Sequence, residues 1–120
     1  MRVQLNKTFT FEAAHSIPTF PDGHKCRRLH GHSFHVEVQV EGEVDERLGY
    51  LVDYGDIKAA CEPIRQKLDH YFLNEIEGLE LPTSENLARW IWQRLKPALP
   101  LLSAVVVRET CDSGCVYRGE

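Results

Sequence analysis

Alternation of apolar and polar residues dominates the first forty positions of the chain. Odd positions carry Val3, Leu5, Phe9, Phe11 and Ala13, with polar residues between most of them. A period of two is typical of a strand with one buried face. The even positions then repeat the pattern with Phe34, Val36, Val38 and Val40. The pattern predicts two strands, separated by a loop at residues 16–29 that holds two prolines and many charges.

Helical spacing replaces this alternation in the middle of the chain. One predicted helix face consists of Ile57, Ala60, Cys61, Ile64 and Leu68. Asp53 or Asp56 can cap the start of this helix, and Pro63 inside the pattern predicts a kink or a restart. The segment "PTSEN" at residues 82–86 predicts a second helix with Thr83 or Ser84 as its N-cap.

Two short apolar segments near the C-terminus, "SAVVVRET" and "CVYR", predict two further strands. The order β, β, α, α, β, β is typical of an α+β fold. We therefore expect a four-stranded antiparallel sheet with two helices on one face. A chain of 120 residues is expected to form a single domain, residues 1–120.

Composition argues against several classes of function. The net charge is -4 and no dense run of Lys and Arg occurs, which disfavours nucleic-acid binding. The N-terminus lacks the apolar region of a signal peptide, and no apolar run approaches the ~20 residues of a membrane span. We therefore expect a cytoplasmic protein without nucleic-acid or membrane partners. Its four cysteines are expected to be thiols, metal ligands or catalysts rather than disulfides.

Three histidines continue the apolar parity of the two N-terminal strands. His15 extends the odd series, and His30 and His32 precede the even series. If these strands pair antiparallel, the three imidazoles meet at one end of the hairpin. Such a set suits Zn²⁺ and leaves a fourth position open for substrate or water. Two alternatives remain: unrelated polar residues at a sheet end, or a closed structural zinc site with Cys26 as fourth ligand.

A second group of polar residues offers proton transfer and substrate binding. Asp69 and His70 are adjacent where the first helix ends, and a carboxylate can orient an imidazole for proton transfer. Such pairs also occur by chance. Glu109 shares the parity of the preceding apolar strand, so its carboxylate either points inward, where it needs donors, or lies exposed at the strand end. A guanidine-like ligand edge would supply two donors.

The remaining candidates are expected to have structural or surface positions. We expect His24 and His35 at the surface and Cys61 in the core. Cys111 and Cys115 are interpreted as packing or turn thiols. The local basic cluster Lys25, Arg27 and Arg28 is either a solvated loop or a contact for an anionic substrate.

Five motifs resemble the 6-pyruvoyltetrahydropterin synthase family, and in particular its bacterial branch. They are "FEAAH", "GHKCRRLHGHSF", "LDHYFLN", "PTSEN" and "ETCDSGCVYRGE", which follow the family order over nearly the whole chain. The Cys-x3-His-Gly-His spacing from Cys26 to His32 resembles that of the bacterial branch. The pyruvoyl-forming enzymes of the family have a longer spacer between the cysteine and the histidines. The resemblance implies a tunnelling fold whose subunits form barrel-like trimers that stack as homohexamers, with active sites between subunits.

The resemblance also implies a reaction and roles for the candidate residues. Zn²⁺ would be held by His15, His30 and His32. Cys26 would be catalytic together with an Asp69–His70 relay, and Glu109 would anchor the pterin. The implied lyase reaction converts 7,8-dihydroneopterin triphosphate to 6-carboxy-5,6,7,8-tetrahydropterin, acetaldehyde and triphosphate, an early step towards queuosine. Alternatives are a pyruvoyl-forming reaction on the same scaffold and a non-catalytic, zinc-stabilised module.

Overall fold

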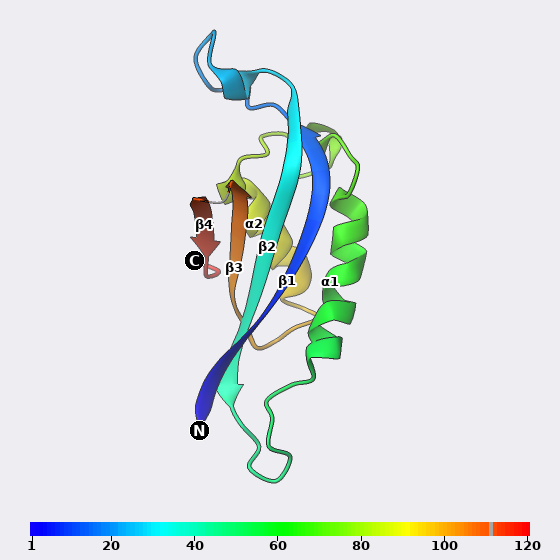
Figure 1. The fold of residues 1–120 in the computed structure, drawn as a ribbon, viewed down its shortest axis with the longest axis vertical. Helices are drawn as coiled ribbons and strands as arrows, with labels where there is room; N and C mark the ends of the chain where they lie inside the picture. The colour runs from blue at the N-terminus through cyan, green and yellow to red at the C-terminus, as the bar shows by residue number, and fades with distance from the viewer. Residues whose placement is uncertain (111) are drawn as a thin grey trace.

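Two long antiparallel strands form the centre of the fold, which a computed structural model describes for residues 1–110 and 112–120. β1 (Arg2–His15) pairs with β2 (His30–Glu43). β3 (Leu102–Thr110) and β4 (Ser113–Tyr117) extend the sheet in the order β1-β2-β3-β4 (Figure 1). All neighbouring strands are antiparallel. β2 begins four residues before the apolar series at Phe34, because residues 30–33 continue the pairing with β1.

Two helices cover one face of the sheet, so the predicted α+β fold is confirmed (Figure 1). α1 (Tyr54–Leu68) begins at the N-cap Asp53, and α2 (Ser84–Leu95) begins at the N-cap Thr83. Of the two effects predicted for Pro63, a kink or a restart, the restart does not occur, because α1 runs through Pro63. Pro63 has no N–H to donate to the carbonyl oxygen of Ala59, one turn earlier. Both residues are exposed, so water can bond this carbonyl oxygen instead. Short 3₁₀ turns, η1 and η2, lie at Lys25–Arg27 and Leu73–Glu75.

The hydrophobic core extends to the end of the β1–β2 hairpin. Phe11 and Phe34 lie opposite each other in register, stack with ring centroids 5.0 Å apart, and are almost fully buried. Burying each ring stabilises the fold by ~1.5–3 kcal/mol. The Phe34 ring also lies 5.2 Å from that of His15 and 4.4 Å from that of His32, centroid to centroid. Core packing therefore supports the histidines directly.

The cysteines in the described part of the chain are free thiols, as the sequence predicts. Cys26, Cys61 and Cys115 are free, and Cys61 is buried in α1 as predicted. Cys111 lies outside the described residues. No helix within the described residues is long and apolar enough to cross a membrane.

Candidate metal centre and catalytic residues

The antiparallel pairing of β1 and β2 brings together the three histidines that continue the alternating apolar positions of these strands. His15, the last residue of β1, is opposite His30, the first residue of β2, and His32 lies one pair further along the same face. The possible ligand atoms of all three lie within 4.8 Å of one another. His15 is fully buried, whereas His30 and His32 are half-buried. One ion could therefore contact all three rings.

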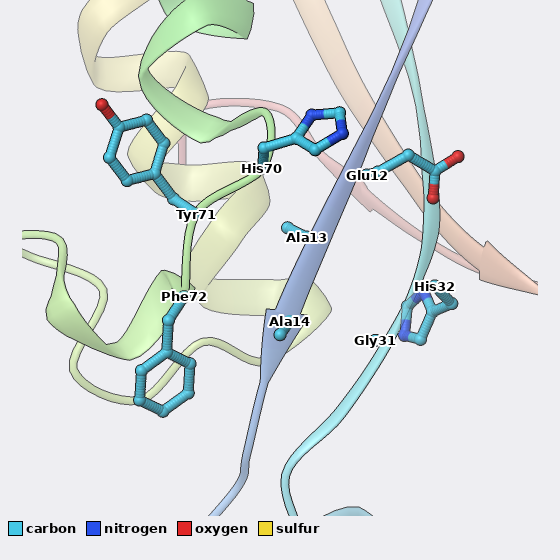
Figure 2. A pocket seen from close by; sticks show the side chains of 8 residues that line it. All are labelled: Glu12, Ala13, Ala14, Gly31, His32, His70, Tyr71 and Phe72. Carbon is cyan, nitrogen blue, oxygen red and sulfur yellow. The ribbon is translucent and has the colours of Figure 1, made fainter.

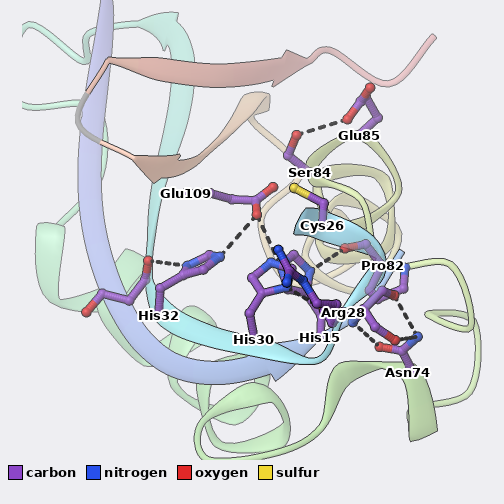
Figure 3. A network of polar contacts seen from close by, with 12 residues as sticks. His15, Cys26, Arg28, His30, His32, Asn74, Pro82, Ser84, Glu85 and Glu109 are labelled. Carbon is purple, nitrogen blue, oxygen red and sulfur yellow. Dashed lines mark hydrogen bonds and ion pairs between the residues drawn. The ribbon is translucent and has the colours of Figure 1, made fainter. Parts of the chain in front are cut away.

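Each of these rings is oriented by a backbone carbonyl group through its Nδ1 atom (Figure 3). The distances are 2.9 Å from His15 to the Pro82 oxygen, 2.8 Å from His30 to the Arg28 oxygen, and 3.0 Å from His32 to the Ser33 oxygen. A carbonyl oxygen only accepts, so each Nδ1 must carry the proton and donate. The Nε2 lone pair of each ring is therefore left for a metal ion, the usual arrangement of metal-binding histidines.

A buried atom without a hydrogen bond tests whether a metal would fit. Among the described residues, His15 Nε2 is the buried side-chain polar atom with no hydrogen-bond partner. Glu109 Oε1 lies 3.3 Å away, within ion-pair range but out of line for a hydrogen bond. A buried polar atom left unbonded costs ~1–3 kcal/mol. A cation shared with His30 and His32 would satisfy this atom, so the donor set fits a metal ion.

Glu109 dominates the electrostatics of the cluster. Its Oε1 also lies 3.3 Å from His32 Nε2, and the carboxylate is one-quarter exposed (26%). Burial lowers the pKa of His15, but Glu109 and the Pro82 carbonyl group raise it more, so the net direction is upward. Burial likewise raises the pKa of Glu109, but the three histidines outweigh it and hold this pKa below its usual value. The carboxylate thus stays ionised and faces the histidines.

A shift in strand register places Glu109 where it can reach the cluster. The β3–β4 pairing is irregular between Arg108 and Thr110, so Glu109 lies at a bulge. Bulges redirect a side chain relative to its neighbours and are frequent beside functional sites. The carboxylate faces inward, which is one of the two positions that parity allowed.

Cys26 lies beside this cluster on the short turn η1. It lines a cavity of about 200 Å³ together with His15, His30 and Glu109, and the α2 start at Thr83–Glu85 forms another wall. Figure 3 shows Cys26 and Glu109, both of which line this cavity, together with the three histidines. Cys26 is absent from the group of residues whose ligand atoms converge. The closed four-ligand site is therefore not the arrangement that these residues adopt.

Asp69 and His70 form a linked pair at the end of α1. His70 Nδ1 lies 2.9 Å from Asp69 Oδ2, and Asp69 Oδ1 accepts the backbone N–H of Glu12 at 2.9 Å. The backbone N–H of His70 in turn donates to the backbone carbonyl oxygen of Glu12 at 2.6 Å. The Glu12 N–H and the His70 ring hold the pKa of Asp69 below its usual value. His70 has a φ of 65°, a left-handed conformation that costs a non-glycine residue energy and is enriched at functional sites.

A separate and larger cavity, about 430 Å³, contains His70 (Figure 2). Its other walls are the ends of the two strands, including Glu12 and His32, and the segment Tyr71–Phe72. In the described part of the chain, no residue lines both this cavity and the one that holds Cys26. The structure of one chain therefore does not bring the predicted catalytic residues Cys26 and His70 into one cavity.

Sequence reasoning missed several groups that shape the site. The three carbonyl groups carry no signal in a side-chain pattern. Asn74 pins the chain after β1 with two hydrogen bonds to the Ser16 backbone, at 3.0 and 2.8 Å, although no role was predicted for it. Arg27, a candidate for anion binding, already pairs with Asp22 at 3.3 Å and donates to the carbonyl groups of Pro18 and Phe20.

Comparison with known proteins places this geometry in a family. Residues 4–120 match the family described as 6-pyruvoyl tetrahydropterin synthase. A curated relative from Synechocystis, named 6-carboxy-5,6,7,8-tetrahydropterin synthase, is 44% identical over 119 residues, which cover 94% of this chain and 91% of the relative. A relative from Pyrococcus furiosus, named dihydroneopterin monophosphate aldolase, is 36% identical over 83% of this chain and 81% of its own.

Solved structures extend the likeness to the fold. The structure of Caenorhabditis elegans 6-pyruvoyl tetrahydropterin synthase superposes with a TM-score of 0.90 at 26% sequence identity. The match covers 100% of this chain and 97% of the nematode chain.

Proposed function

This chain belongs to the 6-pyruvoyl tetrahydropterin synthase family, and we propose that it is a zinc-dependent carbon–carbon lyase that acts on 7,8-dihydroneopterin triphosphate. The proposed products are 6-carboxy-5,6,7,8-tetrahydropterin, acetaldehyde and triphosphate, in an early step of queuosine biosynthesis in the cytoplasm. The main support is the convergence of three oriented imidazoles beside a carboxylate and a thiol. The name of the relative that is 44% identical points to the same product. Residues 1–120 would act as one domain.

The proposed metal ligands are the Nε2 atoms of His15, His30 and His32. Zinc is favoured because neutral imidazoles suit it and three protein ligands are typical of catalytic zinc sites. When bound, zinc would act as a Lewis acid towards the hydroxyl groups of the substrate side chain.

The proposed base is Cys26, which lines the same cavity as His15 and His30 without belonging to the converging ligand set. As a thiolate it would remove a proton from the substrate side chain, after which the carbon–carbon bond breaks as in a retro-aldol step. Glu109 would hold the pterin by accepting two hydrogen bonds from its guanidine-like N–H edge. The ionised state of this carboxylate supports that role.

His70, oriented by Asp69, would be the complementary proton carrier. Because His70 and Cys26 line different cavities, we propose that the complete site forms between subunits of a homohexamer, a dimer of trimers. The size of the Cys26 cavity supports this view, since about 200 Å³ is below the ~300–1,000 Å³ usual for ligand pockets. A neighbouring chain would supply the missing wall.

Product identification tests the proposal most directly. Zinc-loaded protein incubated with 7,8-dihydroneopterin triphosphate should release acetaldehyde and a carboxylated tetrahydropterin. A pyruvoyl-forming enzyme would release no acetaldehyde, and a non-catalytic module would release no product. Either result would overturn the proposed reaction.

A cysteine substitution separates the base from a ligand. Cys26→Ala should keep its zinc and its melting temperature while turnover falls by the ~10²–10⁴ typical of a general base. Cys115→Ala is the matched control, because it removes another partly buried thiol away from this cavity and should remain active. Loss of zinc and stability in Cys26→Ala would instead identify Cys26 as a ligand.

A further inference from the structure

The turn that carries Cys26 is fixed on both sides of the residue by hydrogen bonds to its backbone. The Cys26 N–H donates to His24 Nδ1 at 3.0 Å, and the Cys26 carbonyl oxygen accepts the Ile17 N–H at 2.9 Å. Ile17 is buried (4% exposed), so it is a firm anchor. The other attachment is a side chain, and its loss would leave the Cys26 N–H without this partner, while the turn keeps the backbone hydrogen bond from the Arg27 N–H to the His24 carbonyl oxygen at 3.1 Å.

His24 occupies the N-cap of η1, in an extended conformation with φ of −68° and ψ of 135°. N-cap side chains usually belong to Asn, Asp, Ser or Thr, whose oxygen accepts a backbone N–H two or three residues later. The Nδ1 atom of histidine stands at the same distance along the side chain as the Asn oxygen. His24 therefore acts as a cap whose acceptor is aimed at the catalytic candidate itself.

The tautomer of His24 is opposite to that of the three clustered histidines. A backbone N–H always donates, so His24 Nδ1 must be unprotonated and the ring proton must lie on Nε2. The Nδ1 atoms of His15, His30 and His32 face carbonyl oxygens and must donate. This difference separates His24 from the metal-binding set and gives it the function of an acceptor.

The ring of His24 is itself held in place. It stacks on Phe20 with centroids 4.0 Å apart and planes 9° from parallel. Phe20 lines the cavity that contains Cys26. The stack restricts the χ angles of His24, so the acceptor is already oriented before substrate arrives. The expectation that His24 is merely a surface residue thus overlooked a half-buried side chain with two specific contacts.

We propose that His24 is a positioning residue for Cys26: its Nδ1 atom holds the Cys26 backbone so that the thiol faces the substrate cavity. The inference rests on the proposed function, in which Cys26 is the base. Displacing a reacting group by about 1 Å can cost ~10²-fold in rate. His24 would therefore influence kcat through Cys26 without touching the substrate.

Two substitutions separate the acceptor from the ring. His24→Asn keeps an acceptor at the N-cap but removes the stacked ring, and its kcat should stay within about threefold of wild type because Asn is among the best caps. His24→Phe keeps a ring on Phe20 but has no acceptor, and its kcat should fall by ~10- to 100-fold. KM and zinc content should be unchanged in both. If His24→Phe fails to fold, His24→Ala replaces it, since it also lacks the acceptor.

A double-mutant cycle tests whether the effect passes through Cys26. In a Cys26→Ala background, His24→Phe should reduce the residual rate no further. Equal losses in His24→Asn and His24→Phe, full activity in His24→Phe, or additive losses with Cys26→Ala would each overturn the inference.

Amide exchange measures the same contact without turnover. The Cys26 N–H should exchange about tenfold faster in His24→Phe than in wild type, and His24→Asn should restore protection. Unchanged exchange in His24→Phe would refute the hydrogen bond even in an active enzyme. If the wild-type chain releases no product, the proposed reaction fails while the exchange data still decide whether His24 holds Cys26.

Discussion

Mixing two inactive variants would show whether Cys26 and His70 act across a subunit boundary. Cys26→Ala chains keep His70, and His70→Ala chains keep Cys26. Each variant alone should lose ~10²–10⁴ in rate, the usual contribution of a general acid or base. Because the two residues line different cavities of one chain, a mixed assembly can rebuild a complete site from two defective chains.

The expected recovery follows from counting. If each site takes its thiol from one chain and its imidazole from a neighbour, a random equal mixture restores about a quarter of the sites. The rate should then be about a quarter of wild type, at least ~25-fold above either variant alone. When the mixing ratio is varied, the rate should rise and fall as the product of the two fractions, with its maximum at equal amounts.

The assay requires chains that truly mix. The two variants, carrying different tags, would be refolded together with zinc at several ratios, and native mass spectrometry would verify mixed assemblies. Variants refolded separately and then combined are the control. Verified mixed assemblies that stay inactive at every ratio would refute the intersubunit site, because both groups would then have to act within one chain.

Three further predictions concern the metal, the pterin and the core. His32→Ala should lower zinc affinity by more than ~100-fold, because losing an outer-sphere partner alone costs ~10- to 100-fold. Chelator competition measures this affinity, and the control His35→Ala, which removes an exposed histidine, should leave it unchanged. Glu109→Gln should weaken pterin binding ~10- to 150-fold in calorimetry, since a charge-assisted hydrogen bond contributes ~1.5–3 kcal/mol; unchanged affinity would place the pterin elsewhere. Burial raises the pKa of Cys61 from 9.0 to about 11, with Glu62 as the second cause. The unfolded state therefore releases this proton at lower pH than the folded state does, and roughly 3 kcal/mol of stability should be lost as pH rises from 9 to 11. Cys61→Ala should lose less stability than wild type between those pH values in urea melts, and parallel losses would contradict the argument.

Parity along the strands predicted the central feature of the site. The alternation that buries Phe11 and Phe34 continues to His15 and His30. Because every second side chain of a strand lies on the same face, these histidines must lie on the face of the two phenylalanines. Antiparallel pairing was the one added assumption, and the structure confirms it. The same reasoning did not decide whether the Glu109 side chain points inward or outward. Its direction depends on a β-bulge that the residue types at these positions do not predict.

What the sequence could not predict depends on backbone atoms and on distances between segments. The carbonyl groups that orient the histidines belong to residues with unrelated side chains. His24 was placed at the surface because a lone histidine in a loop gives no sign of what its Nδ1 atom contacts. Asp69 and His70 were recognised as a pair, but only the structure shows that His70 lines a different cavity from Cys26.

The carbonyl groups that orient the three histidines make the site unusually tolerant of sequence drift. Side-chain partners can be deleted by one substitution, whereas every residue at positions 28, 33 and 82 offers a carbonyl oxygen. Evolution can therefore vary Arg28, Ser33 and Pro82 for other purposes without removing the hydrogen bonds themselves. The orientation of the imidazoles follows from the path of the chain, so the three Nε2 atoms can stay aligned for the proposed metal ion while the surrounding side chains change.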